Sequence, residues 1–83
     1  MGKASARFIG KCFGMDAKWT YEVWEDMGLI VKDKFGGWIL TEAGKKIGGS
    51  TSRNFGVPTF QGEKIVPMMN EFLRKVFGNS FPD

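Results

Sequence analysis

The chain has 83 residues, and a single core of this size buries only roughly 60 to 65 % of the unfolded chain's surface, so we expect one domain over residues 1–83. Apolar residues make up 42 % of the chain, which argues against disorder, and one cysteine without any histidine excludes an internal disulfide and a mixed His/Cys zinc site. The net charge of +3 is modest. No apolar run is long enough to cross a bilayer, so we expect a cytoplasmic protein without membrane contact. We expect no bound metal and no cofactor.

The first helical pattern runs from about Ala4 to Phe13, and Gly14 ends it. Its predicted inward stripe consists of Phe8, Ile9 and Cys12. Cations recur every four residues on the opposite face, at Lys3, Arg7 and Lys11. Such a row can contact phosphates, and it can equally be an ordinary solvated face.

A second helix is predicted from about Ala17 to Met27, because Asp16 is a good N-cap and Gly28 follows the last apolar position. The spacing predicts an inward face made of Trp19, Val23, Trp24 and Met27. The residues left outward are Lys18, Thr20, Tyr21, Glu22 and Glu25.

After Gly28 the apolar period changes to that of strands. Leu29–Lys32 and Trp38–Leu40 flank the glycine-containing turn Asp33–Gly37, which is typical of a β-hairpin. Thr41 then caps a third helix that carries cations near its end, at Lys45 and Lys46, where the helix dipole favours them.

Gly48-Gly49 stops the third helix, and the polar loop after it carries Arg53. A brief extended segment, Val57–Phe60, precedes a last helix from about Glu63 to Phe77, whose opening turns contain Pro67. That helix has a broad apolar face, formed by Ile65, Met68, Met69, Phe72, Leu73, Val76 and Phe77. It can cover the core or pair with its copy in a homodimer.

This order of elements predicts an α+β fold of the winged helix-turn-helix type: a helix-turn-helix, a β-hairpin wing, a capped short helix and a C-terminal helix. Several segments resemble the small winged-helix modules of bacteriophage regulatory and antirepressor-type proteins. They are Phe8–Lys11, Gly14-Met15, Met27–Ile30, Leu40–Gly49, Gly56–Pro58 and Ile65–Pro67.

The resemblance implies that the helix over 17–27 enters the major groove of duplex DNA and that the hairpin is the wing. We therefore expect a non-enzymatic DNA-binding module of phage-type transcription regulation. The predicted nucleic-acid contacts are Lys11, Lys18, Thr20, Tyr21, Lys34, Lys45, Lys46 and Arg53.

The predicted recognition helix is locally acidic, since it and its cap carry Asp16, Glu22, Glu25 and Asp26 against Lys18. Two interpretations follow: the N-terminal half contacts bases while the later carboxylates point away, or the helix faces a protein. Under the second, the chain is a phage-encoded inhibitor or adaptor that docks through the acidic helix and exposed aromatics.

The aromatic residues leave similar alternatives open. Phe35, which directly follows Lys34 and lies three residues after Lys32, can be an exposed wing tip that stacks on a base, or it can fold back onto Trp38. Each of the three tryptophans is expected in the core, and any exposed one would mark an interaction surface.

Enzymatic functions find little support. Without histidine, neither a Ser-His-Asp nor a Cys-His arrangement can form, and Cys12 is expected to be a packed small hydrophobe. Gly44–Gly49 has the glycine spacing of a phosphate loop, but Ser50 follows where that motif needs Lys, so we interpret it as a helix end and a turn.

Overall fold

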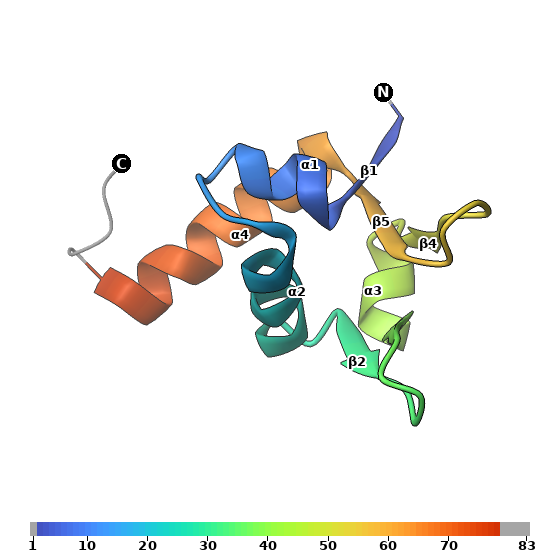
Figure 1. The fold of residues 1–83 in the computed structure, drawn as a ribbon. Helices are drawn as coiled ribbons and strands as arrows, with labels where there is room; N and C mark the ends of the chain where they lie inside the picture. The colour runs from blue at the N-terminus through green and yellow to red at the C-terminus, as the bar shows by residue number, and fades with distance from the viewer. Residues whose placement is uncertain (1, 79–83) are drawn as a thin grey trace.

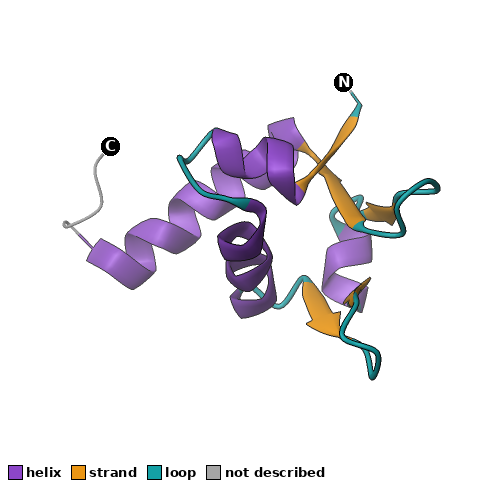
Figure 2. Ribbon diagram, in the orientation of Figure 1, coloured by secondary structure: helices purple, strands orange, loops and turns teal. Residues whose placement is uncertain are grey.

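Residues 2–78, the part of the chain that the computed structural model describes, form four helices and five short strands in an α+β arrangement (Figures 1 and 2). In chain order these are β1 (Lys3–Ser5), α1 (Ala6–Lys11), α2 (Ala17–Asp26), β2 (Ile30–Lys32), β3 (Trp38–Leu40), α3 (Glu42–Lys46), β4 (Ser50–Thr51), β5 (Pro58–Gln61) and α4 (Gly62–Phe77).

The strands form two small antiparallel sheets. The predicted hairpin is confirmed as β2 and β3, with Ile30 opposite Leu40 and Lys32 opposite Trp38. The second sheet has the order β1-β5-β4, so that the brief extended segment before the last helix is its central strand.

The start of the first helix was predicted wrongly. Residues 3–5 pair with β5, where Ala4 lies opposite Phe60, and helix α1 begins only at Ala6. This pairing joins segments far apart in the sequence, which a local periodicity cannot detect. The row of cations predicted from Lys3 to Lys11 is therefore not a single helix face, because Lys3 lies on a strand.

Helices α1 and α2 pack closely at Gly10. A Cβ added there would meet the Thr20 hydroxyl and the Met15 carbonyl oxygen, so only glycine permits this approach. Thr20, predicted to face outward, is fully buried against this point. Its burial costs little because its hydroxyl donates a hydrogen bond of 2.9 Å to the Asp16 carbonyl oxygen one turn earlier.

The inward faces of both helices consequently differ from the predicted ones. Helix α1 buries Ala6, Ile9 and Gly10, whereas Phe8 and Cys12 are exposed. Helix α2 buries Thr20, Val23 and Trp24, Met27 is half-buried, and Trp19 is 60 % exposed. The predicted N-cap is confirmed, because the Asp16 carboxylate accepts a 2.8 Å hydrogen bond from the Trp19 backbone N–H.

An aromatic cluster forms the centre of the core. The fully buried ring of Trp24 meets Phe60 of the sheet edge-on at 4.7 Å between centroids, and Tyr21 of its own helix edge-on at 5.9 Å. Tyr21 in turn stacks on Trp38 of the hairpin, at 5.6 Å and 19°. The cluster thus connects the sheet, α2 and the hairpin.

Helix α4 closes the core from behind α1 and α2 (Figure 1). Its buried face consists of Ile65, Met69 and Leu73, and the Met69 sulfur accepts a 3.2 Å hydrogen bond from the Trp24 indole N–H. Pro67 lies within the first two turns, as predicted. Within residues 2–78, no helix combines the length and apolarity that crossing a bilayer requires.

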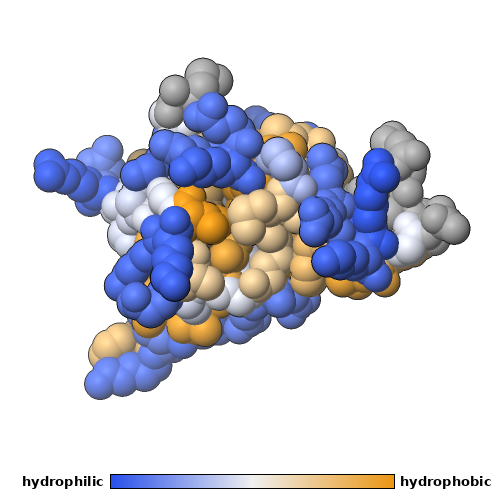
Figure 3. All heavy atoms as spheres, turned by 180° about the vertical axis from the view of Figure 1, so that it is seen from behind, coloured by the Kyte–Doolittle hydropathy of each residue, from blue (hydrophilic) through white to orange (hydrophobic). Residues whose placement is uncertain are grey.

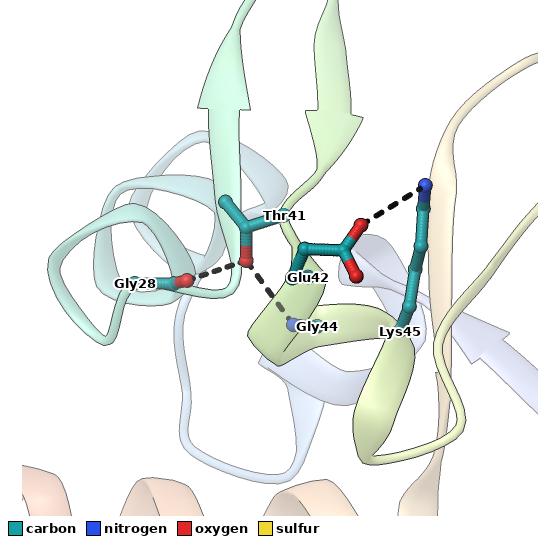
Figure 4. Close-up of polar contacts among 5 residues, drawn as sticks. All are labelled: Gly28, Thr41, Glu42, Gly44 and Lys45. Atoms are coloured by element: carbon teal, nitrogen blue, oxygen red, sulfur yellow. Dashed lines mark hydrogen bonds and ion pairs between the residues drawn. The ribbon is translucent and has the colours of Figure 1, made fainter.

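Thr41 joins the hairpin to α3 and confirms the predicted cap. Its hydroxyl accepts a 3.1 Å hydrogen bond from the Gly44 N–H and donates one of 2.6 Å to the Gly28 carbonyl oxygen (Figure 4). One side chain therefore starts α3 and ties it to the turn after α2.

We predict that Trp24→Ala lowers the free energy of unfolding by about 3 to 5 kcal/mol, because it removes a buried aromatic with three aromatic or sulfur neighbours. Urea denaturation followed by circular dichroism measures the loss. Trp19→Ala on the same helix is the matched control and should cost less than about 1 kcal/mol, since Trp19 is largely exposed. Equal costs at the two positions would contradict this account of the core.

Candidate nucleic-acid interface

Helix α3 and the two hairpins β2–β3 and β4–β5 lie together at one end of the molecule, away from α1 and the end of α4 (Figure 1). Strand β3 packs beside both α3 and β4. Four of the predicted contact residues lie on these elements and all are exposed: Lys34, Lys45, Lys46 and Arg53. We call this surface, from the tip of one hairpin across α3 to the tip of the other, the basic end.

Lys64 adds a cation that the sequence analysis missed. It lies in the first turn of α4, but its ammonium nitrogen is only 3.8 Å from the position that a Cβ on Gly48 would occupy, directly after α3. No local pattern links residues 48 and 64, so only the folded chain brings Lys64 to the basic end.

The acidic residues of the basic end are partly engaged. Asp33 turns its carboxylate inward, where one oxygen accepts 2.8 Å hydrogen bonds from the N–H groups of Phe35 and Gly37 and holds the turn. Glu42 lies 3.9 Å from Lys45, an exposed pair of small energetic value (Figure 4). Asp33, Glu42 and Glu63 together carry three negative charges, so the five cations Lys34, Lys45, Lys46, Arg53 and Lys64 leave the basic end with a net positive charge.

Each hairpin tip exposes a phenylalanine beside a cation. Phe35 is 86 % exposed, with the Lys34 ammonium 5.5 Å from its ring centroid, and Phe55 is 81 % exposed two residues after Arg53. Seen from behind, hydrophilic side chains cover most of this end, with an apolar patch at the lower tip (Figure 3). The alternative in which Phe35 folds onto Trp38 is wrong, because Tyr21 and the Lys32 ammonium, 5.3 Å from the ring centroid, occupy the Trp38 ring.

Sequence reasoning did not single out Phe55. The signal for it was present: a lone aromatic within a polar, glycine-containing loop has no periodic pattern that would place it in a core. Both tips therefore carry an exposed phenylalanine within two residues of a cation, and at Phe35 the two side chains are also in contact range.

Helix α2 does not present the contacts predicted for a recognition helix. Thr20 is buried, so its side chain cannot reach a base, and Tyr21 is half-buried between Trp24 and Trp38, where it lines a cleft beside the hairpin. Of the three predicted contacts on this helix only Lys18 is exposed. The carboxylates of α2 remain at the surface, at Glu22, Glu25 and Asp26.

Those carboxylates line a cleft of about 550 Å³ between α2 and the β2–β3 hairpin. Its other lining residues are Lys18, Tyr21, Lys32, Gly36 and Trp38. Three carboxylates against two ammonium groups give the cleft a net negative charge, which is unfavourable for a phosphate backbone.

The predicted contact set is thus divided. Lys11 lies on α1 outside the basic end, with its ammonium 5.7 Å from the Phe8 ring centroid, and Lys18 belongs to the acidic cleft. Among residues 2–78, no group of three or more acidic or cysteine side chains is arranged to hold a metal ion.

Burial raises the pKa of Tyr21 above the ordinary value of 10.0. A raised folded-state pKa means that its contribution to stability is complete below pH 10.0 and is lost as the pH rises through the folded-state value. Tyr21 is the only tyrosine, so alkaline titration of tyrosinate absorbance reports it alone. We expect a higher midpoint for the folded chain than for the chain in guanidinium, and a shift back towards the unfolded value in Trp38→Ala. A folded midpoint at or below the unfolded one would show that Tyr21 is not packed as described.

The chain therefore presents two surfaces of opposite character, a basic end with two aromatic tips and an acidic cleft on α2. Comparison with known proteins finds no match among family models, curated proteins or solved structures. What the protein does is accordingly inferred from the chemistry of these two surfaces.

Proposed function

We propose that this chain is a non-enzymatic DNA-binding module that docks on duplex DNA through its basic end. The observation that carries the proposal is the gathering of Lys34, Lys45, Lys46, Arg53 and Lys64 around α3 and the two hairpins. Cations on neighbouring elements can contact successive phosphates and release condensed counterions, which provides most of the affinity for a polyanion.

The proposal keeps the winged helix-turn-helix interpretation but changes the docking surface. In it, α1 and α2 are the helix-turn-helix and the β2–β3 hairpin is the wing, as in modules of phage-type transcription regulation. The wing and α3, rather than α2, contact the DNA, because the three exposed carboxylates of α2 would be repelled by a phosphate-lined groove. Phe35 and Phe55 then lie where a ring can pack against sugars or an unstacked base.

Binding of a fluorescently labelled duplex, measured by anisotropy over a range of salt concentrations, tests the proposal. Affinity should fall steeply with salt, and Lys45→Gln with Lys46→Gln should reduce the slope of log K against log salt by about 1.8, since each lost phosphate contact removes roughly 0.9. Neutral glutamine is chosen because glutamate at these positions would oppose the dipole of α3 and repel Glu42.

The matched control removes the same charge elsewhere. Lys11→Gln with Lys18→Gln should leave the salt slope unchanged, because these residues lie outside the basic end. Equal effects of the two double variants would show that binding is diffuse. If the wild-type chain does not bind duplex DNA even at low salt, the proposal is wrong.

A second candidate function is a protein-interaction module that acts as an inhibitor or adaptor. The acidic cleft favours it, because carboxylates beside the exposed edge of an aromatic stack suit a lysine- or arginine-rich segment of a partner. Lys32, packed over Trp38, already illustrates a cation on that ring. Under this function the duplex assay gives no binding, and Glu22→Gln with Glu25→Gln weakens capture of a basic peptide.

A further inference from the structure

An apolar groove runs between α2 and the second half of α4, on the side of α2 away from the hairpin. It has a volume of about 420 Å³. Its floor consists of Met15, Val23, Phe72 and Leu73, and Glu22 and Asp26 lie on the α2 side.

The walls of this groove carry large apolar side chains that water reaches. Trp19 on α2 is 60 % exposed, and Val76 and Phe77 in the last turn of α4 are 56 % and 51 % exposed. A smaller pocket of about 270 Å³ shares Asp26 and Phe72 with the groove and continues along α4, where Met27 and Met68 are its apolar lining and Glu71 and Lys75 its charged lining. Apolar surface edged by charged groups is characteristic of an interaction site.

We propose that the occupant of the groove is the α4 end of a second copy of this chain. The first argument is that the chain supplies both halves of the contact. The last turn of α4 combines the apolar Val76 with the cation Lys75, and the groove combines an apolar floor with the carboxylates Glu22 and Asp26. Apolar surface meets apolar surface while charges of opposite sign meet at the rim.

The second argument is geometric. The end of α4 forms one wall of the groove, so a twofold axis beside this wall can bring each α4 end against the groove of the other copy and close the contact at a dimer. The ion pair that Lys75 forms with Glu71 at 3.5 Å does not prevent this contact. It is an exposed i,i+4 pair, and such pairs contribute little to stability.

The third argument is that self-association leaves the basic end uncovered. Helix α4 points away from α3 and the hairpin tips (Figure 1), so a dimer joined through α4 would carry two basic ends on its outer sides. The inference does not rest on the proposed function, since association is measured without DNA. If both hold, two DNA half-sites follow from the twofold symmetry.

Sedimentation velocity of the full chain over a range of concentrations tests the proposal, and a monomer–dimer equilibrium is expected. Glu22→Lys alone and Lys75→Glu alone should each weaken the dimer roughly tenfold, because twofold symmetry turns each substitution into two broken charge pairs. The double variant Glu22→Lys with Lys75→Glu should restore association to near the wild-type level, which a merely destabilised fold would not do.

Two further variants sharpen the test. Val76→Asp puts a charge on the exposed apolar wall and should abolish the dimer while thermal unfolding, followed by circular dichroism, remains close to wild type. Lys3→Glu makes the same charge change as Lys75→Glu but lies on β1, outside the groove and outside any helix, and it should leave association unchanged. A chain that stays monomeric at every concentration, or a dimer that the double charge exchange does not restore, would overturn the proposal.

Discussion

The structure depends on one buried indole. Trp24 is the place where α2, the three-stranded sheet and α4 meet, because its ring contacts Phe60 and Tyr21 while its N–H reaches the Met69 sulfur. Small domains have few fully buried side chains, so each one carries a large share of the stability. Through Tyr21 and Trp38 the same contact also orients the hairpin relative to α2, and the position of the basic end follows from it.

Features encoded by neighbouring residues were predictable. The caps at Asp16 and Thr41, the hairpin around Asp33–Gly37 and the last helix with its early proline depend on interactions over a few residues, and the structure confirms each of them. The strand β1 was not predictable in this way, since its partner β5 lies more than fifty residues away. The exposure of Phe8 and Cys12 was missed for a related reason: the face that α1 buries is determined by the close approach at Gly10.

The candidate site shows the same division. Five lysines and one arginine in five separate segments were singled out because of their charge, and the fold gathers four of these six cations at one end. Thr20 was predicted to face outward because helical periodicity alone placed Trp19 inward, and the structure buries it instead. A threonine fits the tight contact with Gly10 better than an indole does, so the buried face of α2 differs from the predicted one at its start, whereas Val23 and Trp24 are buried as predicted. Lys64 came to the site only through tertiary structure, whereas a signal for Phe55 was present in the sequence.

The pairing of β1 with β5 has a consequence for the order in which the chain can fold. The first strand must wait for β5, the second strand of the later hairpin, so the packing around α1 and α2 is incomplete until that hairpin has left the ribosome. Such non-local contacts slow folding relative to a purely helical domain of equal size. Until β5 arrives, the aromatic side of α2 has no sheet to cover it, and this nascent stage is when the chain is most open to aggregation or to a chaperone.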